Sequence, residues 1–501
     1  MFSYRLRCAV LFLLIAAACT WFVLPAAAAD SPPFKERASA FEKFPDDWEF
    51  FLGSLKFSPD LKRMAYVVNS GKKYAVAENG KVDPKVFDGI AQGTPIFSPN
   101  SLHRAYIGKR GKTWVNVLDG IEGSAYDAIT PPQFSPDSSR FAYLAKKKDQ
   151  MCVVLDGRED ASFTKIIPDS LSFSPDSKHF VYAGVHQDKK MAAVIDGKKG
   201  PFYEQVSPSI IFSPDSKRVA YAAQKNGKWL LVVDGKETPA YEMVGVYMFS
   251  PDSRRVAYTA GVNKEWFMVL DGKEGMRYEA VGVATFSPDS SHVTHLAIQD
   301  KKWFMITDGK AGPVFDDIVY MTYSPDSAHY CYTAKKGEKQ HVVYDDKPGP
   351  AYDFVASPTF SADSKHLSYV AKKADKLHVV LDGKEGNPYN IVKPPIFSPD
   401  SVHLAYPAQK DGIWLIVTDG REGPAYAAAA NPVWSPDSKH LAFMGMRGTG
   451  WLVVVDGQPA KTTFTGFVKG ATLKFITPTK IQTLAIQEPG INFVRYEIDL
   501  P

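Results

Sequence analysis

Several features that define common protein classes are scarce in this sequence. It contains four cysteines in 501 residues, too few for a disulfide-rich scaffold or a set of paired zinc-binding motifs. The formal net charge is only +4, so composition does not require a nucleic acid as partner. After residue 24 there is no apolar run of the roughly 18 residues that cross a bilayer as a helix. Hydrophobic residues nevertheless make up 45% of the chain, which excludes an intrinsically disordered protein.

The amino terminus has the pattern of an export signal. Arg5 and Arg7 precede an apolar run that ends near Leu24, and small residues follow up to Ala29. This order predicts a signal peptide over residues 1–29 and a mature protein outside the cytoplasm, in the periplasm. Lipid anchoring at Cys19 and an uncleaved anchor are the alternatives. Two cysteines remain after cleavage, Cys152 and Cys331, and we expect both to be buried free thiols.

A repeat dominates the rest of the chain. It opens with an aromatic residue followed by Ser-Pro-Asp, as in Phe57-Ser58-Pro59-Asp60. Ten further clear copies follow at intervals of 37 to 40 residues, and a degenerate twelfth copy opens at Phe475. A period of this length is typical of solenoids and propellers.

The interior of one repeat distinguishes these folds. Ser398-Pro399-Asp400 is a turn motif, and residues 403–408 and 414–418 read as short strands. Asp419-Gly420 is a strong hairpin signal, a third strand begins near Ala425, and the residues before the next aromatic form a fourth. There is no room for a helix of ten residues. We therefore predict an all-β fold, a β-propeller of about twelve four-stranded blades spanning residues 48–501, with residues 30–47 as an N-terminal linker.

The motif also resembles a known family. Phe-Ser-Pro-Asp-Ser, then a basic residue, then Leu-Ala-Tyr, is similar to the WD40-like repeats of the TolB-like β-propellers over residues 48–499. The resemblance implies the same propeller fold. This chain differs in having serine where the family usually has glycine, as at Ser138, Ser177 and Ser216.

The two ends of the repeat region predict how the propeller closes. The last repeat supplies only three strands, within residues 473–498, and Trp48–Phe51 resembles a fourth. We expect residues near 48–52 to pair with residues 493–498, because such an overlap hides the edges of a ring. Twelve blades fit either a single ring or two tandem six-bladed rings, and both arrangements remain open.

A basic residue stands six positions after the opening aromatic in every clear copy. The series is Arg63, His103, Arg140, His179, Arg218, Arg255, His292, His329, His366, His403 and His440. The Asp of the turn lies three residues earlier, so we expect a structural bond to that carboxylate or to a neighbouring carbonyl. Arginine does not ligate metals, which disfavours a metal site built from this series.

The sequence predicts no catalytic, cofactor or metal site. It has no nucleophile elbow, zinc-protease helix, phosphate-binding loop or dinucleotide fingerprint. Five acidic or histidine residues break the repeat without forming a recognisable acid–base pair: His295, His341, His378, Glu204 and Glu242. A binding protein is therefore favoured, and the alternative is a propeller enzyme, a polysaccharide hydrolase or lyase with its site at one mouth of the ring.

The loops between the second and third strands are unusually basic, with 23 Lys or Arg against eight Asp or Glu. In a propeller these loops share one face and the Asp-containing turns share the other, which predicts a polarised molecule. We expect an exported binding or scaffold module, without cofactor or nucleic acid, for a protein partner or an anionic envelope polymer. The candidate interaction residues are Lys146, Lys147, Lys148, Lys189, Lys190, Lys301, Lys302, Lys335, Lys336, Lys372 and Lys373.

Overall fold

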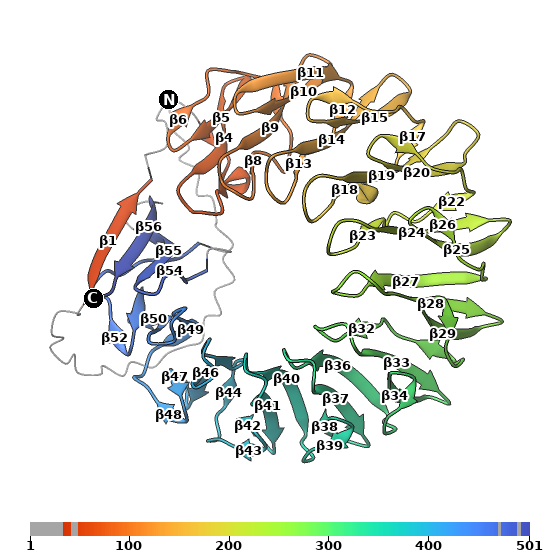
Figure 1. The fold of residues 1–501 in the computed structure, drawn as a ribbon. Helices are drawn as coiled ribbons and strands as arrows, with labels where there is room; N and C mark the ends of the chain where they lie inside the picture. Colours follow the sequence, from red (N-terminus) through yellow and green to blue (C-terminus); the bar gives the residue numbers. More distant parts are fainter. Residues whose placement is uncertain (1–33, 42–48, 469–471, 488–491) are drawn as a thin grey trace.

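Twelve small antiparallel sheets form a single ring (Figure 1). The computed structural model describes residues 34–41, 49–468, 472–487 and 492–501. The sheets follow one another around the ring in chain order, so we number the blades 1 to 12 from β2 onward and name the strands of each blade A to D from the inner edge outward. The predicted all-β propeller is confirmed, and the single ring is the arrangement that forms. The predicted signal segment 1–29, including Cys19, lies outside the described residues.

Strand A lies at the inner edge of each blade and is broken into two short pieces in eight of them. The A strands are β2 (Glu49–Phe50) with β3 (Lys56–Phe57), β7 (Gly89–Ile90) with β8 (Ile96–Phe97), β12 (Ala128–Ile129) with β13 (Gln133–Phe134), β17 (Lys165–Ile166) with β18 (Ser172–Phe173), β22 (Gln205–Val206) with β23 (Ile211–Phe212), β27 (Met243–Phe249), β31 (Ala280–Val281) with β32 (Thr285–Phe286), β36 (Asp317–Tyr323), β40 (Phe354–Phe360), β44 (Ile391–Val392) with β45 (Ile396–Phe397), β49 (Ala428–Trp434), and β53 (Gly466–Phe467) with β54 (Lys474–Thr477). Two 3-10 turns, η1 (Leu52–Ser54) and η2 (Pro168–Ser170), fall within these segments.

Strands B and C form the centre of each blade. The B strands are β4 (Met64–Ser70), β9 (Arg104–Arg110), β14 (Phe141–Lys147), β19 (Phe180–Val185), β24 (Val219–Lys225), β28 (Val256–Val262), β33 (Val293–Gln299), β37 (Tyr330–Lys336), β41 (Leu367–Lys373), β46 (Leu404–Lys410), β50 (Leu441–Arg447) and β55 (Lys480–Gln487). The C strands are β5 (Lys73–Glu78), β10 (Thr113–Leu118), β15 (Gln150–Leu155), β20 (Met191–Ile195), β25 (Lys228–Val233), β29 (Glu265–Leu270), β34 (Lys302–Thr307), β38 (Lys339–Tyr344), β42 (Lys376–Leu381), β47 (Ile413–Thr418), β51 (Gly450–Val455) and β56 (Asn492–Asp499).

Strand D is the outermost. The D strands are β6 (Lys81–Val82), β11 (Ile121–Tyr126), β16 (Arg158–Glu159), β21 (Lys198–Lys199), β26 (Lys236–Glu237), β30 (Lys273–Glu274), β35 (Lys310–Ala311), β39 (Lys347–Pro348), β43 (Lys384–Glu385), β48 (Arg421–Glu422), β52 (Gln458–Pro459) and β1 (Lys35–Ala40). Within the described residues, no helix is long and apolar enough to cross a membrane.

The repeat forms these hairpins for local reasons. In blade 10 the first five residues of β46 are buried, as expected for a central strand covered on both sides by neighbouring blades. The C–D turn lies after the next strand, β47, and there Asp419 and Gly420 have φ of 50° and 76°. Two successive positive φ angles match the right-handed twist of a tight hairpin, and Asp-Gly adopts them at low cost. The predicted strands and turns of this repeat are therefore confirmed.

The hydrophobic core lies between blades and not at a single centre. One cluster joins Val370 and Val379 of blade 9 to Tyr406, Leu415 and Val417 of blade 10. Similar clusters recur around the ring, each built from two adjacent blades. Each blade is thus stabilised by its neighbours, as in other repeat proteins.

The ring closes through the N-terminal segment, but not through the residues we expected. Strand β1 pairs antiparallel with β56, from Lys35 opposite Asp499 to Ala40 opposite Val494. The prediction that residues near 48–52 make this pairing was wrong, because β2 pairs with β4 inside blade 1. Phe50 lies in strand A of blade 1, whereas the prediction placed it in a strand D. Residues 35–40, within the segment assigned as a linker, are therefore the missing strand of blade 12 (Figure 1).

Glu36 fastens this closing strand to the ring. Its carboxylate accepts hydrogen bonds from the backbone N–H of Lys461 (2.8 Å) and of Thr462 (3.0 Å). The hydroxyls of Thr462 (2.6 Å) and Tyr496 (2.8 Å) donate to the same carboxylate. These four hydrogen bonds, which we call the Glu36 clasp, join β1 to the end of blade 11 as well as to its own sheet.

The two cysteines of the described chain lie far from this seam. Cys152 in blade 3 and Cys331 in blade 8 are free and buried, as predicted. Burial raises the pKa of both thiols, to about 11 for Cys152 and about 12 for Cys331, so neither is a reactive thiolate at neutral pH.

Candidate interaction faces

The antiparallel order of the strands gives the ring two chemically different faces. The A–B turns with Ser-Pro-Asp and the C–D turns with Asp-Gly share one face, which we call the aspartate face. The B–C loops and the D–A links share the other, which we call the lysine face.

On the aspartate face, the basic residue of each repeat holds two turns together. Nδ1 of His403 lies 2.7 Å from Oδ2 of Asp419, the aspartate of the Asp-Gly turn in the same blade. The His403 ring also stacks on Trp434 of the next blade, with ring centroids 5.5 Å apart. The structural role is as expected, but the carboxylate is not that of the Ser-Pro-Asp turn. Asp400 accepts instead from the hydroxyl of Ser398 in its own turn.

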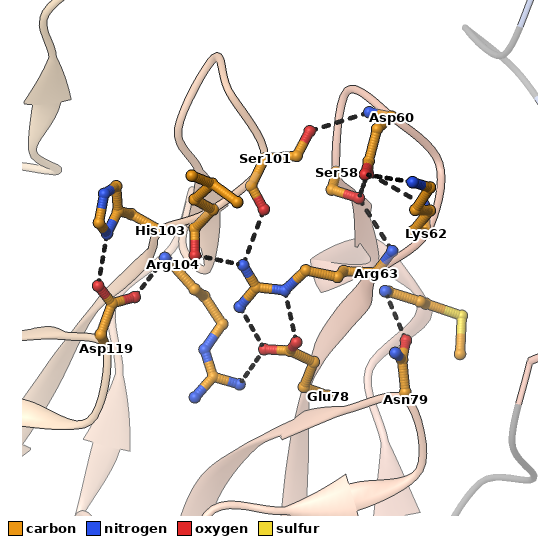
Figure 2. A network of polar contacts seen from close by, with 12 residues as sticks. Ser58, Asp60, Lys62, Arg63, Glu78, Asn79, Ser101, His103, Arg104 and Asp119 are labelled. Atoms are coloured by element: carbon orange, nitrogen blue, oxygen red, sulfur yellow. Dashed lines mark hydrogen bonds and ion pairs between the residues drawn. The ribbon is translucent and has the colours of Figure 1, made fainter. Parts of the chain in front are cut away.

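Arginine extends this contact across the joint between blades (Figure 2). Arg63 donates to Glu78 in its own blade, with Nε 2.6 Å from Oε1. Its Nη1 also donates to the backbone carbonyls of Ser101 (2.9 Å) and Leu102 (2.7 Å) in blade 2. Its guanidinium carbon lies 5.0 Å from the centre of the Phe97 ring. The expected bond to a neighbouring carbonyl is therefore present at this joint.

A serine in the A–B turn makes a second joint between blades. The backbone N–H of Asp60 in blade 1 donates to the hydroxyl of Ser101 in blade 2, at 2.9 Å (Figure 2). Equivalent bonds connect ten successive pairs of blades. The serines are Ser101, Ser138, Ser177, Ser216, Ser253, Ser290, Ser327, Ser364, Ser401 and Ser438. All have positive φ, such as 64° at Ser216, so the joint is made at the expense of backbone strain.

The turn aspartates stay ionised. In Asp176 and Asp215 the hydroxyl of the serine two residues earlier and a backbone N–H two residues later lower the pKa of the carboxyl. The pKa of Asp137 is lowered by the backbone N–H of Ser139, by the hydroxyl of Ser135 and by the hydroxyl of Ser139. The aspartate face therefore carries a ring of carboxylates that remain charged over the physiological pH range.

Three open grooves lie on the aspartate face between consecutive blades. Their volumes are about 590 Å³ between blades 10 and 11, 420 Å³ between blades 9 and 10, and 400 Å³ between blades 8 and 9. Their walls include a histidine or an aspartate of the pairs described above, together with apolar side chains.

The lysine face exposes the residues predicted to form an interaction surface. Ten of the eleven candidate lysines are exposed, and Lys372 is half-buried. Three candidates make ion pairs within the described chain, and the other eight lie within 4 Å of no carboxylate that the structure describes. The pairs are Lys147 with Glu159, Lys302 with Asp316, and Lys373 with Glu385. The surface thus retains positive charge that its own carboxylates do not neutralise.

Sequence reasoning missed a series of acidic residues on this same face, in the D–A links. Asp88 accepts from Nζ of Lys73 in blade 1 (2.8 Å) and from the N–H of Gly111 in a loop of blade 2 (2.7 Å). These bonds, from Lys73 above all, lower the pKa of Asp88. The sequence signal for this series is an acid that recurs directly after the strand D aromatic residue. These acids reduce the net positive charge of the lysine face. The other members are Asp127, Glu204, Glu242, Glu279, Asp316 and Asp353.

The residues that break the repeat do not gather into a site. Glu204 and Glu242 belong to the recurring acids of the D–A links and so do not break the repeat. Glu204 accepts the backbone N–H groups of Asn226 and Gly227, and Glu242 accepts that of Asn263. His341 and His378 occupy equivalent C-strand positions and bond backbone carbonyls of their own blades. His295 is buried, and burial lowers its pKa to about 4. No group of three metal-ligating side chains occurs within the described part of the chain.

Comparisons with known proteins identify no family. No protein-family model matches the chain, and no curated protein matches it. A crystal structure of the eukaryotic initiation factor aligns over 72% of this chain and 97% of its own, with 14% identity and a TM-score of 0.33. A crystal structure of the tricorn protease aligns over 89% of this chain and 55% of its own, with 11% identity and a TM-score of 0.27. The chain is a twelve-bladed β-propeller, and its function has to be argued from its own residues.

Proposed function

We propose that the chain is an exported β-propeller of the TolB-like type. It acts as a binding or scaffold module and contacts an acidic protein or an anionic envelope polymer through its lysine face. The export pattern of residues 1–29 and the Phe-Ser-Pro-Asp-Ser repeat support the location and the family. The observation that carries the binding role is the set of eight candidate lysines that lie on one face outside any ion pair among the described residues.

Electrostatics gives this surface a physical function. The aspartate face holds carboxylates with lowered pKa, and the lysine face holds exposed ammonium groups beyond those that pair with its own acids, which supports a charge distribution polarised along the axis of the ring. A polarised field orients an approaching anion toward the basic face and raises its rate of encounter. Exposed charges are screened beyond about 8 Å at physiological ionic strength, so binding should weaken as salt increases.

Charge reversal on the lysine face tests the proposal. One variant carries seven Lys→Glu substitutions, at Lys146, Lys147, Lys148, Lys335, Lys336, Lys372 and Lys373. A matched control carries seven exposed reversals on the aspartate face, at Lys62, Lys178, Lys217, Arg254, Lys365, Lys384 and Lys439. Retention on immobilised dextran sulfate is measured at low and at high salt.

The natural protein and the control should be retained at low salt and released at high salt. The lysine-face variant should elute early under both conditions. Equal retention of the two variants would mean that net charge alone governs binding. A natural protein that elutes no later than the lysine-face variant would refute the proposal.

A further inference from the structure

Large apolar side chains are exposed along one arc of the inner edge of the ring. Seven lie on the A strands of five consecutive blades, 6 to 10, or between the two pieces of such a strand. They are Met243, Val246, Val283, Val319, Tyr320, Phe354 and Ile391, with exposed fractions from 37% to 79%. The A strands form the inner edge of the ring (Figure 1), so we call this set the rim arc. Exposed apolar groups gathered in this way mark interaction sites more often than isolated ones do.

The arc is concentrated in one part of the ring. Over the other seven blades, the A-strand segments that the structure describes expose only two large apolar side chains, Phe51 and Ile476. Three arc blades open strand A with a large apolar residue, Met243, Phe354 or Ile391, where the flanking blades have Gln205 and Ala428 in the same cross-strand register. The two remaining arc blades have Ala280 and Asp317 at this position. The arc therefore breaks the symmetry of the repeat, which a purely structural role would not require.

Two of the A strands are bulged where they carry arc residues. The pairing of β27 with β28 shifts register between Val244 and Tyr247, and that of β36 with β37 shifts between Ile318 and Met321. A bulge leaves residues outside the ladder and re-aims their side chains. The second bulge contains Val319 and Tyr320. These two arc residues are adjacent in the sequence, and both are highly exposed.

Positive charge lies beside the arc. Phe354 is the cross-strand partner of Lys372, so the two side chains occupy neighbouring positions on one sheet. Lys336, at the end of β37 in the blade before, and Lys372 pair with no carboxylate among the described residues.

Asp317 on β36 is the cross-strand partner of Lys335, and two acids of the neighbouring D–A links have partners of their own. Asp316 accepts from Nζ of Lys302 and from the N–H of Gly337. Asp353 accepts from Nζ of Lys339 and from the N–H of Ala374. These bonds commit the carboxylates to their own loops, and positive charge is left next to apolar surface.

The arc also offers backbone groups. Strands β27, β36 and β40 each end their sheets, so one edge of each carries N–H and C=O groups without a ladder partner in its sheet. A polypeptide can bond such an edge, whereas a lipid bilayer supplies no backbone donors. The arc also follows the inner edge of a ring (Figure 1), which suits a narrow chain better than a flat membrane.

We propose that the rim arc binds an extended acidic segment of a partner protein. The segment places apolar side chains on Val319, Tyr320 and Phe354 and carboxylates near Lys336 and Lys372. This inference rests on the proposed function of the lysine face. It specifies the partner that binds at blades 6 to 10 as a polypeptide with alternating acidic and apolar residues.

A triple substitution tests the apolar half of the arc. The rim variant is Val319→Ser, Tyr320→Ser and Phe354→Ser. The matched control replaces three exposed apolar residues at turns of the aspartate face, and it is Leu102→Ser, Ile121→Ser and Val402→Ser. The probes are a fluorescein-labelled peptide that alternates glutamate with leucine, the same peptide with serine in place of leucine, and vesicles with anionic lipid. Anisotropy reports peptide binding, and co-sedimentation reports vesicle binding.

The glutamate–leucine peptide should bind the natural protein at least about tenfold more tightly than the glutamate–serine peptide. The rim variant should lose most of that difference, and the control should keep it. Equal binding of the two peptides, equal effects of the two triple variants, or a preference for vesicles would each overturn the inference.

The same probes separate this inference from the proposed function. If the glutamate–serine peptide and dextran sulfate bind in a lysine-dependent way but leucine adds nothing, the lysine face stands and the rim arc fails. If the natural protein is retained on dextran sulfate no better than the lysine-face variant, the lysine-face proposal fails. If the glutamate–leucine peptide binds equally well after the seven reversals, which include Lys336 and Lys372, the arc does not select an acidic segment and the inference fails.

Discussion

Replacing Glu36 should open the ring at its seam. The carboxylate accepts four hydrogen bonds, two from the backbone N–H groups of Lys461 and Thr462 and two from the hydroxyls of Thr462 and Tyr496. Hydrogen bonds to a charged group contribute about 1.5–3 kcal/mol each when buried, and their effects are not additive. Because Glu36 is only half-buried, we expect Glu36→Ala to lower the free energy of opening β1 by about 3 kcal/mol, close to the contribution of one such bond at full burial.

Hydrogen exchange of β56 measures this opening directly. A loss of about 3 kcal/mol corresponds to exchange roughly 100-fold faster for the β56 amides that face β1, while the β56 amides that face β55 and the amides of blade 6 should keep their rates. Arg37→Ala, an exposed neighbour on the same strand, is the control. Unchanged exchange in β56, or equal acceleration in blade 6, would refute the role of Glu36 as a clasp.

The clasp should also respond to pH. Burial raises the pKa of Glu36, but the hydrogen bonds from Thr462, Lys461 and Tyr496 outweigh burial and lower it below its ordinary value. A carboxyl with a lowered folded-state pKa stabilises the fold above its unfolded pKa, and this stabilisation is lost as pH falls through the folded value. Protection of β56, corrected for intrinsic exchange rates, should therefore decrease in acid, and Glu36→Gln should show a weaker pH dependence.

Substitutions at three further positions test the joints and the buried histidine. Ser216→Ala removes the acceptor for the N–H of Asp176 but keeps the strained φ, so urea unfolding should show a loss of about 1–2 kcal/mol, and Ser216→Gly, which relieves the strain, should lose less. A larger loss of unfolding free energy for Ser216→Gly than for Ser216→Ala would contradict the strain assigned to Ser216. His403→Ala removes the bond to Asp419 and the stacking on Trp434, and should cost about 1–2 kcal/mol by the same measurement while leaving retention on dextran sulfate unchanged. Burial lowers the pKa of His295 to about 4, so the unfolded chain takes up this proton first, and the fold should lose about 2 kcal/mol as pH falls from about 7 to about 5. His295→Tyr, which restores the residue typical of this position, should reduce the loss of stability in acid. If the unfolding free energy of this variant depends on pH as in the natural protein, His295 is not the cause of that loss.

The sequence predicted the strands and turns because their causes are local. Asp419-Gly420 takes positive φ whatever surrounds it, and the apolar residues of β46 need only neighbouring strands. The closing strand escaped prediction because its partner β56 lies more than 450 residues away. Lys35–Ala40 also has neither an aromatic residue nor a regular apolar alternation to mark it as a strand.

The side-chain partners were harder to predict than the strands. For His403 the sequence predicts a bond to the carboxylate of its own turn or to a neighbouring carbonyl, but the hairpin brings Asp419, sixteen residues later, to the ring nitrogen. The rim arc could not be predicted because exposure at Val319 and Tyr320 depends on where β36 bulges against β37. The exposure of the B–C loop lysines could be predicted from the sequence, because it depends on their position in a loop.

Lysine footprinting tests the central claim most directly. The natural protein is acylated with a lysine-specific reagent in the presence and absence of dextran sulfate, and mass spectrometry reports the modification of each lysine. We expect protection of Lys146, Lys148, Lys335 and Lys336 on the lysine face, lost at high salt, and none at exposed lysines of the aspartate face such as Lys178. Equal protection of both faces, or protection confined to the aspartate face, would contradict the account.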